Sequence, residues 1–174
     1  MIQGGKIALR PVERDDLAQL EHWKSDPELL GEFNVFGLHG RQGREEQFAK
    51  DGLLNADRGQ LLVVDSGGEV VGMASYWRVD HGPRNGGHAY QIGTHLAPDR
   101  RGQGLGVEVA ALLAGYLFET YPVQRVEAET DVENSAAQRA LEKAGFTREG
   151  VLRAAQWRAG GWHDLVMYSV LRGE

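Results

Sequence analysis

The sequence contains no cysteine, which excludes disulfide bonds, thiolate metal ligands and a cysteine nucleophile. Aromatic residues make up only 8%, and no apolar run is long enough to span a membrane as a helix. Positive charge is in deficit, because 25 acidic residues outweigh 19 basic ones and give a formal net charge of −6. We therefore expect no membrane segment and no direct nucleic-acid partner, and a cationic partner such as an amine fits the charge balance better.

The residues that are present describe an ordinary globular chain. Its 174 residues, 41% of them hydrophobic, suffice for a buried core without cross-links. We expect a single domain over residues 1–174 and, because no signal-peptide pattern is seen, a cytoplasmic location. The 24 glycines exceed the usual share and indicate many turns or close approach of the backbone to a ligand.

Apolar spacing along the chain predicts a mixed α and β fold in the order β-α-α-β-β-β-α-β-α-β-β. The Gly- and Arg-rich segment Gly37–Arg44 lacks periodicity and predicts a mobile loop. Expected strands lie near 7–9, on both sides of the Ser66–Glu69 turn, at 88–96, at 125–131 and in two final runs. Expected helices lie between Val12 and Asp26, near 45–54, from about 104 to 119, and after Asn134.

The stretch APDRRGQGLGVEV, residues 97–109, places three glycines at alternate positions where a helix is predicted to begin. A helix start presents unpaired N–H groups and a positive dipole end to an anion, and glycine is needed where a side chain would hold the anion away. On this stretch alone, a flexible turn with two solvated arginines explains the pattern equally well.

Two familiar phosphate motifs do not fit. A Walker loop ends in Gly-Lys-Ser/Thr, whereas Gly106 is followed here by Val107 and Glu108. A Rossmann fingerprint opens a βαβ unit near the N-terminus, whereas this turn lies past the middle of the chain after a predicted hairpin.

The motif Arg101-Gly102-Gln103-Gly104-Leu105-Gly106 resembles the R/Q-x-x-G-x-G/A pyrophosphate loop of the GNAT superfamily of acyl-CoA-dependent N-acyltransferases. Residues 131–153 resemble the family's second hallmark, in which an Asn caps a short helix that ends in Lys-x-Gly-Phe. Residues 161–171 (GWHDLVMYSVL) and the opening LRPVERDDL look like the subgroup that includes ribosomal-protein N-terminal acetyltransferases. The resemblance covers nearly the whole chain.

This resemblance implies an α+β GNAT fold with a central, mostly antiparallel twisted sheet whose fourth and fifth strands splay apart. The pantetheine arm of acetyl-CoA would lie in the split and pair with main-chain groups near His95, Leu96 and Ala97, a form of β-augmentation. The resemblance assigns the pyrophosphate to main-chain donors of Arg101, Gly102, Gln103, Gly104, Leu105 and Gly106.

Three residues near the second hallmark have two interpretations each. Asn134 serves as a helix N-cap by position alone, and in the family the equivalent Asn also faces the pantetheine arm. Arg139 and Lys143 lie one turn apart and could reach the phosphates of the coenzyme, or they belong to an ordinary solvated face.

Transfer to an amine requires removal of a proton, stabilisation of an oxyanion and preferably protonation of the leaving thiolate. The sequence departs from the family's pattern at three positions that could serve these roles: Gln91, Ala137 and Gln156 are all unreactive. These departures leave coenzyme binding intact and put the acid–base assignment in doubt. Positioning together with a water chain is a further route, because orientation alone lowers the barrier by several kcal/mol.

Alternation along residues 125–131 places Glu127, Glu129 and Asp131 on one face of the predicted strand. Our first choice for the proton acceptor is Glu129, directly or through water, and our second is His95. A surface carboxylate is the competing interpretation of Glu129.

Other noticeable residues have plainer explanations. The histidines His81, His88 and His95 lack a carboxylate at ligand spacing, so we predict no metal site. Five aromatic residues could line an acceptor pocket or belong to the core, namely Trp23, Phe33, Phe36, Trp157 and Trp162.

Three functions remain open from the sequence. The leading one is an acetyl-CoA-dependent N-acetyltransferase acting on a primary amine, most similar to enzymes that modify protein N-termini. The second changes the acceptor to a small amine such as a polyamine, an amino acid derivative or an antibiotic. The third is a non-catalytic CoA-binding sensor or scaffold, and a homodimer is compatible with each.

Overall fold

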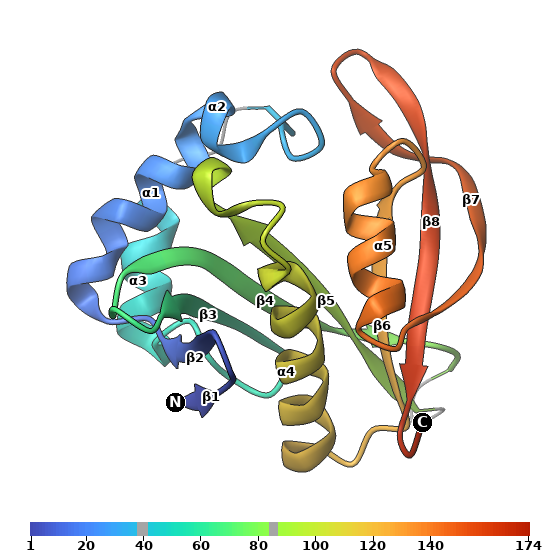
Figure 1. Cartoon of the computed structure of the whole chain (residues 1–174), viewed down its shortest axis with the longest axis horizontal. Coiled ribbons are helices and arrows are strands. Elements are labelled where there is room, and N and C mark those ends of the chain that lie inside the picture. The colour runs from blue at the N-terminus through green and yellow to red at the C-terminus, as the bar shows by residue number, and fades with distance from the viewer. Residues whose placement is uncertain (38–41, 84–86) are drawn as a thin grey trace.

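An eight-stranded sheet forms the centre of the protein (Figure 1). The computed structural model describes residues 1–37, 42–83 and 87–174, without the side chain of Gln42. The strand order is β1-β2-β3-β4-β5-β6-β8-β7, and all neighbours are antiparallel except the parallel pair β5 and β6. The strands are β1 (Ile2–Gln3), β2 (Ile7–Pro11), β3 (Arg58–Asp65), β4 (Val70–Asp80), β5 (His88–Leu96), β6 (Arg125–Asp131), β7 (Thr147–Arg158) and β8 (Gly161–Leu171). The predicted α+β class and the mostly antiparallel sheet are confirmed.

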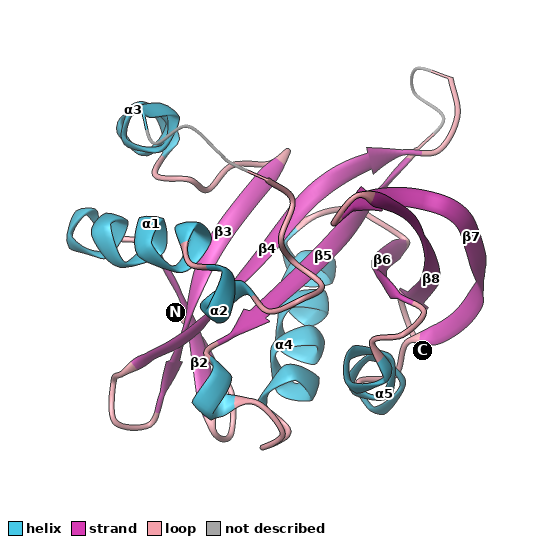
Figure 2. Ribbon diagram, turned by 90° about the horizontal axis from the view of Figure 1, so that it is seen from above, coloured by secondary structure: helices cyan, strands magenta, loops and turns pink. Residues whose placement is uncertain are grey.

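Helices cover both faces of the sheet. Figure 2 shows α1 and α3 on one side and α4 and α5 on the other. Among the described residues the helices are α1 (Leu17–Ser25), α2 (Pro27–Leu30), α3 (Gln42–Asp51), α4 (Leu105–Thr120) and α5 (Ser135–Lys143). None of these is long and apolar enough to cross a membrane.

The core follows this layering because each helix buries its apolar stripe against one sheet face. The larger cluster packs Val109, Leu113 and Leu117 of α4 against buried apolar side chains of six strands, β2, β3, β4, β5, β6 and β8. The smaller cluster, under α1 and α3, consists of Val12, Leu20, Leu53, Leu62 and Met73. The amphipathic pattern predicted for the helix near 104–119 is therefore confirmed.

Three features differ from the sequence prediction. Strand β1 was not expected, and neither was α2, which starts at Pro27 because proline suits the first helical position and the Asp26 side chain caps the N–H of Glu28. Part of the loop predicted over Gly37–Arg44, at 38–41, lies outside the described residues. From Gln42 onward the chain is helical, so that part of the loop prediction is wrong: Arg44 is held by Glu21 and Gln60, and these contacts override the weak local propensity.

The parallel pair β5 and β6 separates after a short contact. Only Tyr90, Gln91 and Ile92 are in register with β6, opposite the segment that ends at Ala128. Beyond Ile92 no strand of the described residues pairs with this edge of β5, and Figure 1 shows β5 and β6 diverging toward the end where α4 begins. The predicted splay of the fourth and fifth expected strands corresponds to this split.

Candidate active site at the split between β5 and β6

The edge of β5 presents main-chain groups to the split. Ala97 donates its N–H to Val71 on the β4 side at 3.0 Å, so by strand alternation the main-chain groups of Leu96 and Thr94 face the opposite way, into the split. The carbonyl of Ala97 accepts from Arg100 at 2.9 Å, so both main-chain groups of Ala97 already have partners. The N–H and carbonyl of Thr94 and the N–H of Leu96 are therefore the main-chain groups that can pair with a ligand there, since the Leu96 carbonyl accepts from Arg101.

A glycine loop connects β5 to α4 at the mouth of the split. Gly102 and Gly104 have φ angles of +73° and +81°, which only glycine adopts without strain. A Cβ atom built on either residue would meet no atom within 4 Å, so both face open space. Glycine is therefore suited to both positions, because it adopts the positive φ angle and leaves the adjacent space free for a ligand.

The loop also offers unpaired donors. Within the described part of the chain, the main-chain N–H groups of residues 102–106 donate to no acceptor. The Gly104 residue caps α4 without a side-chain bond, so the positive end of the helix dipole adds to these donors. Consecutive free N–H groups at a helix start form an anion site of the kind that binds a diphosphate.

The side chains of the loop fold away from these donors. Arg101 donates through Nε to the carbonyl of Leu96 at 3.0 Å and through Nη2 to that of Leu29 at 2.7 Å. Gln103 donates to the carbonyl of Asp99 at 2.9 Å, and Leu105 is buried in the core. These side chains shape and anchor the loop, and its main chain faces the ligand.

Helix α5 forms the wall of the split that lies opposite β5. A Cβ atom on Gly106 would lie 3.7 Å from Cβ of Ala140 and 3.9 Å from Leu96, so Gly106 faces both α5 and β5 at van der Waals distance. At the start of α5, Asn134 caps the helix by accepting from the N–H of Ala137 at 3.1 Å. Its Nδ2 group donates to no described residue and remains available to a ligand.

The two basic residues of α5 are exposed. Arg139 reaches only the hydroxyl of Ser135, at 3.3 Å, and the exposed Lys143 forms no bond with a described residue. Neither side chain is fixed by the fold, so their phosphate contacts remain a prediction.

The three acidic residues on one face of β6 have different environments. Glu127 is only 1% exposed and pairs with His81 and with Arg125. Asp131 is buried against Arg158. Glu129 is half-buried, bonds to no described residue, and directly follows Ala128, the last residue in register with β5. Only Glu129 combines a free carboxylate with a place at the start of the split.

His95 lies on the α1 side of the sheet. Its ring is 6.1 Å from that of Trp23, and its Nε2 is buried without a partner among the described residues. Burial and the nearby positive charge of Arg101 lower the pKa of His95 to about 4. The ring is therefore neutral at pH 7, but it is a weak base, because efficient bases have a pKa near the working pH.

The lowered pKa of His95 predicts that the free energy of unfolding depends on pH in the acid range. The unfolded chain protonates His95 near its ordinary pKa of 6.5, whereas the folded protein keeps it neutral down to about 4. Between these pH values the unfolded state binds more protons, so the free energy of unfolding should fall as the pH drops from 6.5 to 4. We expect His95→Gln to remove about 1 to 2 kcal/mol of this fall, since partial exposure screens the effect. Urea titrations across this pH range test it, and an unchanged slope in the variant would contradict it.

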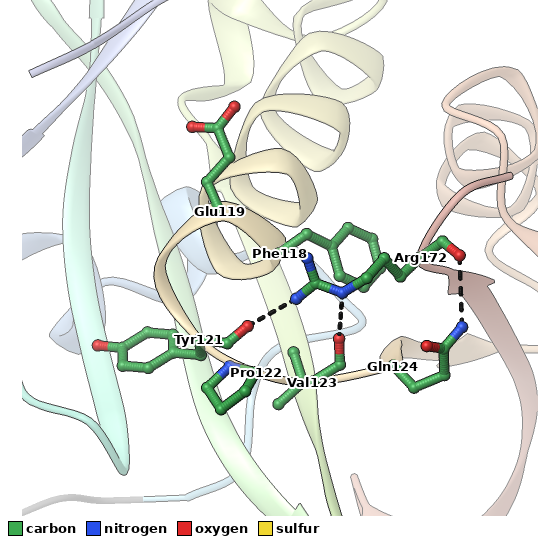
Figure 3. Close-up of a pocket in the computed structure, with 7 residues that line it drawn as sticks. All are labelled: Phe118, Glu119, Tyr121, Pro122, Val123, Gln124 and Arg172. Carbon is green, nitrogen blue, oxygen red and sulfur yellow. Dashed lines mark hydrogen bonds between the residues drawn. The ribbon is translucent and has the colours of Figure 1, made fainter.

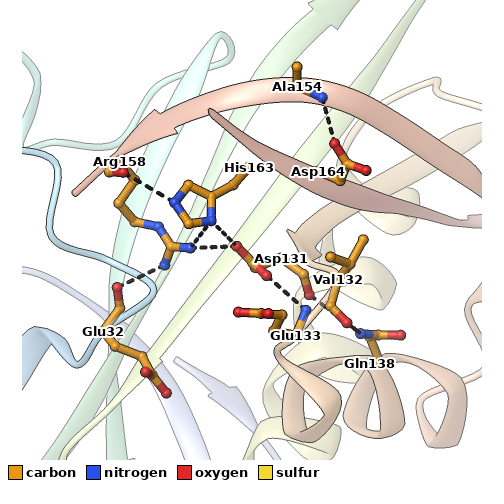
Figure 4. Close-up of polar contacts among 9 residues, drawn as sticks. All are labelled: Glu32, Asp131, Val132, Glu133, Gln138, Ala154, Arg158, His163 and Asp164. Carbon is orange, nitrogen blue, oxygen red and sulfur yellow. Dashed lines mark hydrogen bonds and ion pairs between the residues drawn. The ribbon is translucent and has the colours of Figure 1, made fainter. Parts of the chain in front are cut away.

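A buried polar network that the sequence did not predict lies at the far end of β6 (Figure 4). Arg158 donates through Nη2 to Asp131 Oδ2 at 2.5 Å and through Nη1 to the carbonyl of Glu32 at 2.8 Å. His163 Nε2 lies 3.1 Å from the Arg158 carbonyl, which it can reach only as a donor, so its Nδ1, 3.0 Å from Arg158 Nη2, is free to accept. These residues come from distant parts of the chain, and no local pattern brings them together.

The aromatic candidates divide into two groups. Trp23 is on the buried face of α1, and Phe33 lies under the guanidinium of Arg158, 5.1 Å from ring centroid to Cζ. Phe36, Trp157 and Trp162 are exposed, and the two tryptophans form an edge-to-face pair at 5.4 Å near the β7–β8 turn. Trp23 therefore belongs to the core, whereas Phe36, Trp157 and Trp162 lie at the surface.

No group of three or more metal-ligating side chains occurs in residues 1–37, 42–83 and 87–174. A hollow of about 530 Å³ lies elsewhere, at the C-terminal end of α4 (Figure 3). There Arg172 donates to the carbonyls of Val123 and Tyr121 at 2.9 and 2.7 Å, and its guanidinium covers Phe118. The hollow is roughly 24 Å from the glycine loop along the helix axis, so it is separate from the split.

Known proteins share this fold and sequence pattern. A family model described as an acetyltransferase (GNAT) domain matches residues 6–147. The chain is 28% identical over 172 residues to an uncharacterized N-acetyltransferase, p20, of Bacillus licheniformis, covering 97% of this chain and 94% of that protein.

Two solved structures are also similar. A spermidine N-acetyltransferase from Vibrio cholerae, in complex with CoA and spermine, aligns with a TM-score of 0.82 at 19% identity over 97% of both chains. A ribosomal L7/L12 alpha-N-protein acetyltransferase in complex with coenzyme A aligns with a TM-score of 0.80 at 20% identity over 98% of this chain and 97% of that one. The two structures share the fold of this chain, and the family match covers most of it: the protein belongs to the GNAT acetyltransferase family and is an N-acetyltransferase.

Proposed function

We propose that this enzyme transfers the acetyl group of acetyl-CoA to a primary amine. The observation that carries the proposal is the row of unpaired main-chain N–H groups at residues 102–106, directly beside the split between β5 and β6. These donors bind the diphosphate of the coenzyme, and the open edge of β5 at Thr94 and Leu96 pairs with its pantetheine amides. The Nδ2 group of Asn134 approaches the same arm from the opposite wall.

The acceptor side lies on the α1 face of the sheet. Glu129 accepts the proton of the attacking amine, directly or through water, as a nitrogen–carbon bond forms and the carbon–sulfur bond breaks. Gly93 follows the last register pair on β5, and its missing side chain leaves space beside Glu129. Trp77 borders this space, since its ring lies 3.4 Å from a Cβ built on Gly93. Ala137 has no hydroxyl, so the leaving thiolate takes its proton from solvent.

The acceptor class we propose first is the N-terminal α-amine of a peptide or protein. The exposed aromatic side chains of Phe36, Trp157 and Trp162 support it, because exposed rings can pack against the residues that follow the amine. A small amine such as a polyamine is the second candidate. The hydrogen bond from Arg158 to the Glu32 carbonyl favours a small amine. This bond joins residues 31–37 to the last hairpin and leaves less room between them for an extended peptide.

We also propose the domain, the cellular compartment and the oligomeric state in which the reaction takes place. The proposal places a single acetyltransferase domain over residues 1–174 in the cytoplasm. It includes no metal and leaves room for a homodimer.

A thiol-release assay with acetyl-CoA tests the function. We expect steady release with at least one member of a panel of short peptides, polyamines and amino acid derivatives, and mass spectrometry should find the product heavier by one acetyl group. Tight CoA binding without turnover across the panel would favour the sensor or scaffold function instead.

The proton acceptor has its own prediction. Glu129→Gln keeps the shape of the side chain and removes its basicity, so kcat should fall by about 100-fold while the KM for acetyl-CoA stays within twofold. Glu133→Gln, an exposed acid four residues along the chain, is the matched control and should retain activity. A Glu129→Gln enzyme with wild-type kcat would show that water and positioning suffice.

A further inference from the structure

A short segment crosses the open end of the split and is held from both sides. We call residues 29–33 the strap, and Figure 1 shows the chain after α2 extending toward the β7–β8 hairpin. On one side Arg101 donates to the carbonyl of Leu29 at 2.7 Å. On the other, Arg158 donates to the carbonyl of Glu32 at 2.8 Å. The strap therefore connects the glycine loop to the last hairpin through two guanidinium groups.

The sequence of the strap suits these contacts. Gly31 has a φ angle of +74°, and a Cβ atom there would lie 3.1 Å from Arg101 Nη1, so glycine permits both the turn and the close approach. Phe33 lies against the Arg158 guanidinium at 5.1 Å, which adds a cation–π contact. The strap is thus fitted to both arginines.

Of the two arginines, Arg158 is the more firmly held. Its side chain is 3% exposed and that of its partner Asp131 is 2% exposed. The hydrogen bond to His163 Nδ1 fixes the orientation of the same guanidinium. The planar fork reaches the carboxylate and the ring nitrogen through Nη2 and the Glu32 carbonyl through Nη1, whereas the three donors of an ammonium group diverge from a single nitrogen and cannot reproduce this spacing.

The hydrogen-bond network around Arg158 lies close to Glu129, the proposed proton acceptor. Asp131 lies two residues after Glu129 on the same face of β6, a separation of about 7 Å along the strand. The network therefore fixes the strap against the strand that carries the proton acceptor, and on the acceptor side of the sheet.

We propose that Arg158 is a positioning residue for the acceptor amine, acting through the Glu32 carbonyl and Phe33 to hold the strap across the split. Asp131 and His163 orient Arg158 for this task. The expected effect on the kinetics of the amine rests on the proposed function. The contacts by which Arg158 holds the strap do not depend on that function.

The test is Arg158→Lys, which keeps a positive charge opposite Asp131 and loses the fork. We expect kcat/KM for the amine to fall by roughly 10- to 30-fold while the KM for acetyl-CoA stays within twofold. Hydrogen exchange should accelerate about tenfold or more at the amides of Leu30, Gly31 and Asn34, which donate to carbonyls of Asp26, Pro27 and Gly31. Phe33→Leu should change both quantities in the same direction by a smaller factor.

The matched control is Arg125→Lys, which alters an arginine paired with Glu127 and Glu149 at the other end of β6. It should leave both the amine kcat/KM and the exchange of the strap unchanged. If Arg158→Lys does not fold, Phe33→Leu decides the question with the same two measurements.

The outcomes separate the two proposals. If the wild-type protein acetylates no amine, the proposed function fails, and faster exchange in Arg158→Lys still supports the bracing. Unchanged exchange in the variant overturns the bracing whatever the activity. Faster exchange with an unchanged amine kcat/KM overturns the positioning role.

Discussion

Gly104→Glu should abolish coenzyme A binding while leaving the protein folded. The new carboxylate would enter the open space beside the unpaired N–H groups of residues 102–106, where the diphosphate is expected. A like-charge contact at about 4 Å near a protein surface costs about 4 kcal/mol, which corresponds to a loss of roughly 1,000-fold in affinity. Isothermal titration calorimetry with CoA measures it. Because the loop is exposed, we expect the unfolding free energy to change by no more than about 2 kcal/mol.

Two control variants separate charge from conformation. Gly104→Ala introduces the strain of a side chain at a φ of +81° without any charge, and it should weaken CoA binding far less. Gly115→Glu adds the same charge to an exposed site on the same helix, where a Cβ meets no atom within 4 Å, and should leave the affinity unchanged. Wild-type affinity in Gly104→Glu would show that the diphosphate binds elsewhere.

Asp131→Ala should lower the free energy of unfolding by about 3 to 5 kcal/mol, because it leaves the charge of Arg158 buried without a counter-ion. The Asp131 side chain also accepts from the N–H of Glu133 at 2.8 Å, and this turn bond is lost as well. Urea denaturation at pH 7 gives the value.

The charge argument has its own controls. Asp131→Leu combined with Arg158→Met replaces the ion pair by apolar side chains and should recover much of the stability. Asp80→Ala breaks an exposed pair with Arg78, whose side chains are 62% and 42% exposed, and should cost less than about 1 kcal/mol. A cost of under 1 kcal/mol for Asp131→Ala would mean that water reaches Arg158 in the folded protein.

Most of the side chains considered for acid–base catalysis at the split cannot serve as a general base in this protein. Gln91, Ala137 and Gln156 provide no acid or base, and His95 is neutral with a pKa of about 4. Two of the three acids on β6 are used in buried ion pairs. Glu129 is the acid on β6 whose carboxylate stays free at the start of the split. The reaction we propose therefore depends on this one proton acceptor and on accurate positioning of the amine.

Local signals explain which elements the sequence predicted. Strand β5 has the predicted bounds, 88–96, because turn residues and Pro98 flank an apolar run. Helix α5 follows from the Asn134 cap and from Gly145, which has a φ angle of +92°. Strand β1 and helix α2, with two and four residues, are too short to produce a period and form only because of β2 and the Asp26 cap.

The sequence by itself determined the order of the longer strands and helices, the glycine loop and the family, because caps, turns and apolar periods lie within a few residues of one another. The tertiary structure alone decided which of the acids on β6 stays free and what holds the strap. Arg158 meets Glu32 across 126 positions of sequence and Asp131 across 27, and such contacts depend on burial and packing that no local pattern records. The low pKa of His95 has the same origin, since desolvation exists only once the chain has folded around the ring.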